Sequence, residues 1–124
     1  MYLLLDNSDR ENICICKWLN NGWSQNFFPS SEYGLVEAID HFLKKEDKKV
    51  EDLKGLAVLV GKGSFTSTRI AITVVNTLAL VLKIPVVSVS SVLDTNVVQK
   101  IKNSIPGVFA AAVYSGEPNI GGKK

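Results

Sequence analysis

The stretch "GKGSFTSTRIAITVVNTLALVLKIPVVSVSS", Gly61–Ser91, decides the fold because it predicts a loop, a long helix and a buried strand in succession. The glycine-rich start places backbone N–H groups at a helix N-terminus, where Ser64 or Thr66 can act as the N-cap. We expect the helix to run from about Ser64 to Lys83. Ile84-Pro85 ends it, because the residue before a proline disfavours the helical conformation. The apolar run after the proline predicts a buried strand.

The long helix is apolar on two sides. The residues of its first stripe are Ile70, Val74, Leu78 and Val81. Those of its second stripe, more than a quarter-turn away, are Ile72, Val75, Ala79 and Leu82. One stripe can cover a sheet. A second stripe left exposed would be an apolar patch of a kind that monomers avoid, so either a partner protein or a neighbouring helix of the same chain is expected to cover it.

The residues before this stretch predict three strands, a helix and a fourth strand. "MYLLLDNS" is an apolar run closed by turn-forming residues, and "NICICKWLNNGWSQNFFP" predicts two strands joined at Asn20-Asn21-Gly22, since Asn and Gly tolerate the positive φ of a tight hairpin. A helix is expected from about Glu32 to Lys45, capped by Ser30 or Ser31. After a charged connector, "GLAVLVG" is typical of a central strand covered on both faces.

The C-terminal part predicts a shorter helix in "LDTNVVQKIKNS" and a final strand in "GVFAAAVYSGE". The complete order, βββαβαβαβ, predicts the α/β class: a mixed sheet with helices on both faces. A chain of 124 residues has room for one core. We therefore expect a single domain over residues 1–117 and a flexible tail over residues 118–124.

Composition limits the classes of partner. The formal net charge is +2, and the lysines form no basic stripe interleaved with aromatic residues, so contact with RNA is expected to be indirect. No apolar run reaches the roughly 20 residues that span a bilayer. The absence of a leader peptide and the presence of only two cysteines favour a reducing, cytoplasmic location.

Cys14 and Cys16 stand two residues apart in an alternating run, so on a strand they share one face but are splayed too far to form a disulfide. A zinc site needs about four ligands, and the single histidine, His41, belongs to a different element. We therefore predict no metal site.

The loop before the long helix lacks both nucleotide signatures. Five residues rather than four separate Gly55 from Gly61, and Lys62 is followed by glycine rather than Ser or Thr. The dinucleotide fingerprint fails because Thr66 occupies its third glycine position. Helix capping is the favoured interpretation. The alternative is anion binding by Gly61, Gly63, Ser64 and Thr66, with Asp6 to Ser8 as a second phosphate loop.

Asp6, at the end of the first predicted strand, raises a nuclease hypothesis. Paired magnesium ions need several converging carboxylates. Glu32, Glu37 or Asp40 could supply a second carboxylate, but "GLAVLVG" carries no acidic residue at its end. A turn-capping role before Asn7 and Ser8 is therefore favoured for Asp6. Hydrolase chemistry is disfavoured too, because the chain has no G-x-S-x-G elbow.

The loop and long helix resemble the TsaB (YeaZ) family, glycoprotease-like proteins of tRNA threonylcarbamoyladenosine biosynthesis. The chain has "GKGSFTSTRIA" and "LALVLKIPVVSVSSV" where the family has GPGSFTGLRIG and a helix ending in a similar proline-containing run. "LLLDNS", "SSEYGLVEAIDHFL" and "VFAAAVYSGE" are similar to further family segments. Departures include Lys62, Ser67, Thr68 and Ala71 at signature positions, Ser30 where members often have histidine, and no second half after about Tyr114.

This resemblance implies a ribonuclease-H-like domain of the actin/Hsp70-like ATPase superfold. In that superfold ATP lies in a cleft between two related domains. A chain with only the first domain would form one wall, so no cofactor is expected and ATP with magnesium should bind poorly. The resemblance also implies a non-catalytic platform that pairs, through helices of the first domain, with a TsaD-like protein or with itself.

The predicted partner surface combines the first helix with the long helix. Its residues are Leu35, Ile39, Phe42, Thr66, Arg69, Ile70, Thr73, Val74 and Thr77. Arg69 matches the arginine of the family signature and is predicted to orient the junction through a carboxylate or carbonyl of the partner. The alternative function, from a different class, is a small nucleotide- or anion-binding protein that uses the Gly61–Thr66 loop.

Overall fold

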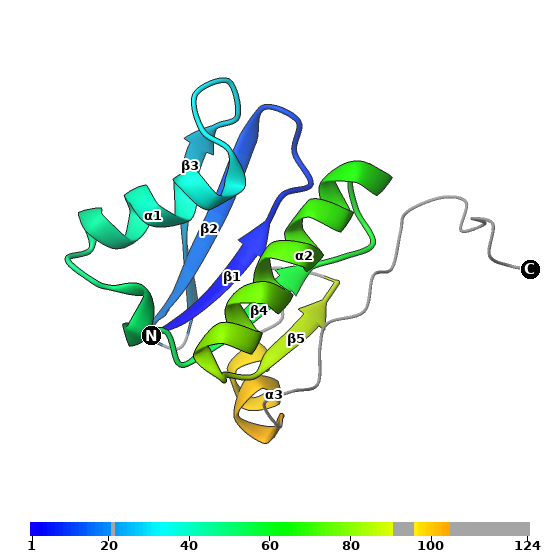
Figure 1. Ribbon diagram of the computed structural model, residues 1–124. Coiled ribbons are helices and arrows are strands. Elements are labelled where there is room, and N and C mark those ends of the chain that lie inside the picture. Colours follow the sequence, from blue (N-terminus) through cyan, green and yellow to red (C-terminus); the bar gives the residue numbers. More distant parts are fainter. Residues whose placement is uncertain (21, 91–95, 105–124) are drawn as a thin grey trace, which may run out of the picture.

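The computed structural model describes residues 1–20, 22–90 and 96–104 of the chain (Figure 1). Its strands are β1 (Tyr2–Asp6), β2 (Asn12–Leu19), β3 (Gly22–Pro29), β4 (Gly55–Leu59) and β5 (Val86–Val89). Its helices are α1 (Leu35–Lys45), the 3₁₀ turn η1 (Val50–Asp52), α2 (Phe65–Leu82) and α3 (Val97–Asn103).

The strands form one mixed sheet in the order β3-β2-β1-β4-β5. β1, β2 and β3 pair antiparallel, with Leu19 opposite Gly22 across the hairpin turn, where Asn20 has a φ of 52° as the sequence predicts. β4 pairs parallel to both β1 and β5. α2 forms the crossover from β4 to β5, whereas the chain between β1 and β4 contains β2, β3 and α1. The interior strand β4 is buried along its whole length, which agrees with its continuous apolar sequence.

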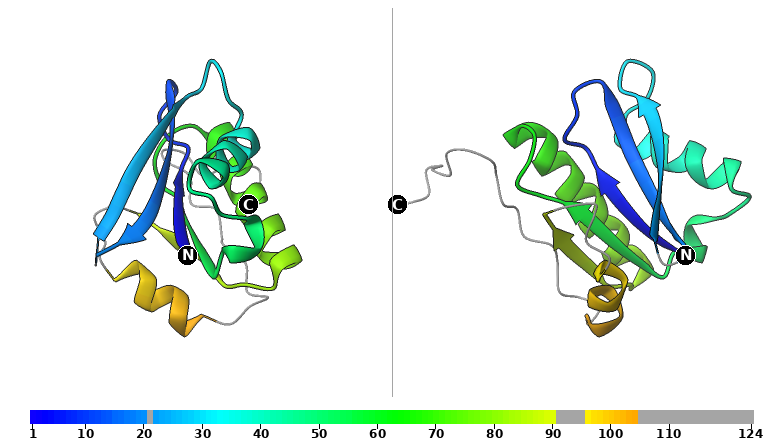
Figure 2. Two further views of the ribbon diagram at one scale, coloured as in Figure 1. Left: turned by 90° about the vertical axis from the view of Figure 1, so that its left-hand side faces the viewer. Right: turned by 180° about the vertical axis from the view of Figure 1, so that it is seen from behind.

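Helices cover both faces of the sheet, as predicted. α1 and α2 lie side by side on one face, and α3 lies on the other (Figure 2). Because side chains alternate along a strand, Leu3 and Leu5 of β1 point toward α1 and α2, whereas Leu4 points toward α3. The result is a three-layer α/β arrangement with two hydrophobic clusters.

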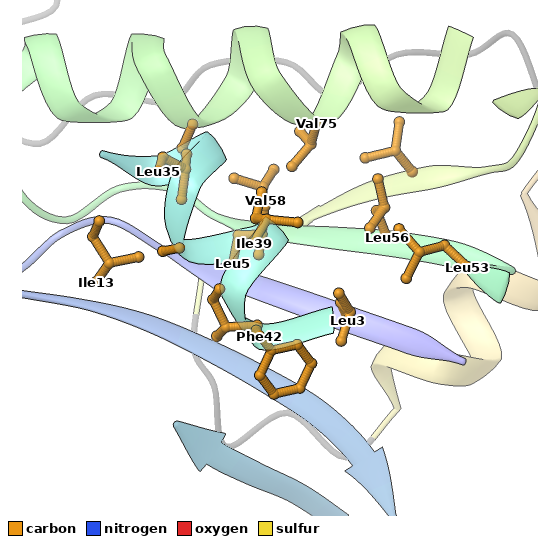
Figure 3. Close-up of a cluster of buried hydrophobic side chains, with 14 of the residues drawn as sticks. Leu3, Leu5, Ile13, Leu35, Ile39, Phe42, Leu53, Leu56, Val58 and Val75 are labelled. Atoms are coloured by element: carbon orange, nitrogen blue, oxygen red, sulfur yellow. The ribbon is translucent and has the colours of Figure 1, made fainter. Parts of the chain in front are cut away.

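The larger cluster lies between the sheet and the α1/α2 layer. Figure 3 shows Phe42 and Ile39 of α1 among side chains of β1 and β4, with Val75 of α2 reaching in from the neighbouring helix. Phe42 and Val75 are completely buried. Lys17 of β2 forms an ion pair with Glu46, the C-cap of α1, and so fixes the end of α1 to the sheet.

The smaller cluster lies between the sheet and α3. Gly55, at the start of β4, makes this contact possible, because a Cβ at that position would lie only 2.3 Å from Cγ2 of Ile101. Ile101 and Val97 of α3 are completely buried against β4 and β5. A glycine on the interior strand β4 thus lets a short helix approach the backbone closely.

The start of α1 differs from the prediction. The sequence predicts a helix from about Glu32 with Ser30 or Ser31 as its cap, but α1 begins at Leu35. The carbonyl of Pro29 accepts hydrogen bonds from the N–H groups of Glu32 and Tyr33, so these residues form a turn. The N-cap is Gly34, whose N–H donates to the Glu37 carboxylate at 2.7 Å.

The other predicted elements that fall within the described residues are found. α2 agrees with the predicted range: Ser64 is its N-cap, and Lys83 ends it in the left-handed conformation with a φ of 58°. α3 lies within the predicted segment, of which residues 93–95 are outside the described part of the chain. The predicted strand over residues 107–117 and the predicted domain end at residue 117 lie outside the described residues.

Candidate interaction surface

The two apolar stripes of α2 have different environments. Val75 and Ala79, from the second stripe, are buried against the sheet, and Ile72 and Leu82 pack on the same core. The prediction that one stripe covers the sheet is therefore confirmed. Thr68 and Ala71 complete the buried face; the Thr68 hydroxyl donates to the carbonyl of Lys62 at 3.3 Å.

The first stripe faces outward. Ile70 is 46% exposed and Val81 is 69% exposed, while Val74 and Leu78 are half-buried beside α1. α1 therefore covers only part of this stripe. The same side of the molecule also exposes Val36 of α1, whose side chain is 63% accessible. These large aliphatic side chains form an apolar surface over two adjacent helices.

A groove of about 480 Å³ separates α1 from α2 on this surface. The residues that line it are Val36, Ile39, Asp40, Leu43, Val50, Thr73, Val74, Thr77 and Leu78. Its volume falls within the usual range for ligand pockets. Among the described residues that line it, Asp40 is the only acidic or basic one, and its carboxylate pairs with Lys44 at 3.0 Å. The groove can therefore accept a large apolar side chain.

A second depression, of about 390 Å³, continues the groove along α2. Its lining residues are Thr66, Arg69, Ile70, Thr73 and Val74, of which Thr73 and Val74 also line the groove. The structure thus brings together all six α2 residues that the sequence assigns to a partner surface. We call the groove, this depression and the exposed Val36 and Val81 the α1–α2 surface.

The α1 residues predicted for this surface need correction. Phe42 is completely buried and Leu35 nearly so, and both face the sheet (Figure 3). Ile39 is also buried in the core, where it forms part of the groove floor. The apolar positions of α1 at helical spacing are those that face the core, so they are not free to contact a partner. Val36, which lies off that stripe, is the exposed residue that sequence reasoning missed.

The loop Gly61–Thr66 is built as a helix cap. The Ser64 hydroxyl accepts a hydrogen bond from the Ser67 N–H at 3.0 Å, so the favoured capping interpretation is confirmed, with Ser64 rather than Thr66 as the cap. Gly63 has a φ of 77°, and a Cβ there would lie 2.8 Å from Cα of Ser8. The two candidate phosphate loops therefore touch each other directly.

Asp6 serves the turn after β1. Its Oδ1 accepts hydrogen bonds from the N–H of Ser8 at 2.9 Å and from the Ser8 hydroxyl at 2.5 Å. The amide of Asn7 donates to the Ser67 carbonyl at 3.2 Å and fixes this turn to the first turn of α2. The turn-capping interpretation is confirmed. Within residues 1–20, 22–90 and 96–104, no three metal-binding side chains come together.

Cys14 and Cys16 are free thiols on the α3 face of β2, with their sulfur atoms 3.6 Å apart. The prediction of a shared face is confirmed, but the two side chains are not splayed apart as expected, because their sulfur atoms are in hydrogen-bond contact. Their hydrogen bond lowers the pKa of Cys14 and raises the pKa of Cys16, whose burial raises it further. The pair packs among aliphatic side chains as a small apolar unit.

The fold and the site define a ribonuclease-H-like α/β domain with an open apolar surface over two helices. The chain matches the family described as TsaD, tRNA N6-adenosine threonylcarbamoyltransferase, over residues 31–116. It belongs to that family. In the described part of the chain, none of the helices has the length and apolar character needed to cross a membrane.

Among solved structures, the chain is similar to YeaZ from Pseudomonas aeruginosa, with 27% identity over 72% of this chain and a TM-score of 0.61. It is also similar to an uncharacterized protein with similarity to the peptidase YeaZ from the same organism, with 26% identity, 72% coverage and a TM-score of 0.60. The resemblance to TsaB (YeaZ) proteins is therefore confirmed. The chain spans 44% and 42% of the lengths of these two proteins. No curated protein sequence matches it significantly.

Proposed function

We propose that this chain is a non-catalytic interaction subunit in tRNA threonylcarbamoyladenosine modification, with the α1–α2 surface as its binding site for a TsaD-like protein or for a second copy of itself. Membership of the TsaD family and likeness to YeaZ support the link to this modification. The subunit would contribute binding surface rather than reacting groups, and any contact with tRNA would pass through its partner.

The observation that most strongly supports this proposal is the apolar α1–α2 surface. Val36, Ile70 and Val81 are large aliphatic side chains that remain exposed beside the groove. Full burial of such a side chain contributes about 1.5–3 kcal/mol, so covering three of them would contribute several kcal/mol to association. Thr77 supports this role, because its hydroxyl donates to the Thr73 carbonyl at 2.8 Å and so is already satisfied within α2.

The turn after β1 and the loop before α2 both have structural roles, which favour this proposal over nucleotide binding. Asp6 is engaged by Ser8, Ser64 caps α2, and Gly63 lies against Ser8. The Asp6, Ser8 and Ser64 side chains are therefore hydrogen-bonded within the chain. The α1–α2 surface, by contrast, has apolar side chains that the chain leaves exposed.

The test measures assembly of the purified chain by size-exclusion chromatography with light scattering, alone and with the TsaD-like protein of the same cell. We expect a homodimer, a complex or both. Val36→Glu should weaken the assembly at least about tenfold, because it places a charge at the groove. Leu19→Glu is the matched control: Leu19 is similarly exposed, at the hairpin end of β2. A chain that stays monomeric and ignores the TsaD-like protein would exclude the proposal.

A further inference from the structure

We infer that Cys14 and Cys16 form a two-coordinate binding site for a soft monovalent metal ion, Cu(I). Both thiols belong to the hydrophobic cluster between the sheet and α3. The α1–α2 surface lies on the opposite face of the sheet (Figure 2). The metal site is therefore separate from the surface that carries the proposed function, and it does not depend on that function.

The spacing of the two sulfur atoms fits a bridging ion. They lie 3.6 Å apart in hydrogen-bond contact, so a thiol proton already lies between them. A metal–thiolate bond is about 2.3 Å long, so an ion with two sulfur ligands in line needs them about 4.6 Å apart. Each sulfur atom must then move outward by about 0.5 Å, a rotation of roughly 20° about χ1 that stays within one staggered well. The ion can thus replace the proton without movement of the backbone.

The same strand geometry disfavours a disulfide. Residues two apart on a strand lie about 6.6 Å from each other, with their side chains pointing in the same direction. A disulfide needs Cβ atoms about 3.5–4.5 Å apart, so closing one here would have to bend β2. β2 is paired on both sides at this point, because Cys14 is opposite Asp6 of β1 and Phe27 of β3. The pair therefore resists disulfide formation and keeps both thiols available as ligands.

Two sulfur ligands favour Cu(I) over other ions. Thiolates bind soft ions such as Cu(I) and zinc, but zinc needs about four ligands, whereas Cu(I) is stable with two in line. The exclusion of a metal site from the sequence applies to zinc, and no three metal-binding side chains come together in the described residues. Cu(I) that displaces one thiol proton leaves the site uncharged, which suits its aliphatic surroundings.

Asp6 places a negative charge beside the pair. It stands directly opposite Cys14 in the register of β1 and β2, so both side chains lie on the same face of the sheet. The Asp6 carboxylate interacts electrostatically with both thiols, which favours a cation between them. Both cysteines are buried, whereas Asp6 and the adjoining turn are partly exposed. A cation can therefore approach the thiols from the turn after β1.

The test is an anaerobic titration of the full chain with Cu(I) held by the coloured chelator bicinchoninate. The chain has only two cysteines, so thiol-bound copper reports this pair. We expect the chain to remove one Cu(I) per molecule, and the copper X-ray absorption spectrum to show two sulfur neighbours. Cys14→Ala and Cys16→Ala should each weaken binding more than about 100-fold, because losing a ligand costs more than the 10–100-fold of an outer-shell change.

His41→Ala is the matched control, because His41 is the only histidine of the chain and lies on α1, away from the pair. This variant should bind Cu(I) as the wild-type chain does. Three results would each overturn the site: no removal of Cu(I) from the chelator, binding that persists in both alanine variants, or a spectrum dominated by nitrogen and oxygen neighbours. Circular dichroism checks the fold of the alanine variants. Where one fails to fold, the stoichiometry and spectrum of the wild-type chain decide.

Discussion

The two faces of α2 carry similar amounts of apolar character but different side-chain sizes. The buried face consists of Thr68, Ala71, Val75 and Ala79, whereas the exposed large residues are Ile70, Leu80 and Val81. Small side chains let the helix lie close to the sheet, where larger ones would force it away. The fully buried positions of α2 are therefore small, although the larger Ile72 and Leu82 also pack against the same core. Large aliphatic residues left on the other face need a different explanation, such as a partner.

The largest expected effect is the difference in the free energy of unfolding between a lysine on the buried face of α2 and a lysine on its exposed face. Val75→Lys should reduce the free energy of unfolding by about 4 kcal/mol or more, because it buries an unpaired ammonium group in the core. Val81→Lys should change it by no more than about 0.5 kcal/mol in the isolated chain, since residue 81 is exposed and a cation near a helix C-terminus is favourable. Urea denaturation at low protein concentration measures both.

The same two variants separate stability from assembly. Val81→Lys should weaken self-association although it leaves the fold intact. If Val81→Lys destabilised the monomer as much as Val75→Lys, the outer face of α2 would be part of the core, and the contrast between the two faces would be wrong.

Periodicity and residue type were sufficient to predict most of the fold. Ile84-Pro85 ends α2 as predicted, and the stripe containing Val75 and Ala79 covers the sheet. The start of α1 was missed because a turn at Pro29 competes with the serine caps. That turn depends on pairing between Ser30 and Glu11, which are distant in sequence and whose contact no local pattern indicates.

The site was predicted less completely than the fold. Hydrophobic residues at helical spacing identified α1 as amphipathic, but the same residues, Leu35 and Phe42, were assigned to the partner surface although they form the core. The detectable signal was Val36, an apolar residue off the main stripe of α1. The groove itself depends on how α1 side chains such as Val36 and Leu43 pack beside Thr73 and Leu78, which lie at least 30 residues further along the chain. A local sequence pattern does not indicate that contact.

Gly61 and Gly63, in the loop before α2, also differ in how closely they approach the rest of the chain. Both have positive φ, but a Cβ at Gly63 would collide with Ser8, whereas a Cβ at Gly61 would meet no atom within 4 Å. Gly63→Ala should cost about 3 kcal/mol, since strain and overlap add, and Gly61→Ala about 1 kcal/mol from strain alone. Thermal unfolding of the two variants compares them. Equal losses would show that backbone conformation, rather than the contact between the loops, decides stability here.

The smallest expected effect concerns ATP. In the loops that precede α2 and follow β1, the side chains of Asp6, Asn7 and Ser64 are hydrogen-bonded within the chain, so calorimetric titration of ATP with magnesium should give no saturable heat. Saturable binding would favour the nucleotide-binding alternative, and its loss in Ser64→Ala would assign it to this loop. The same titration of Val36→Glu is the control. This variant places a charge in the groove and leaves both loops unchanged, so any nucleotide binding by the loops should persist in it. The outer face of α2 and its N-terminal loop can therefore be tested separately, although they belong to one helix.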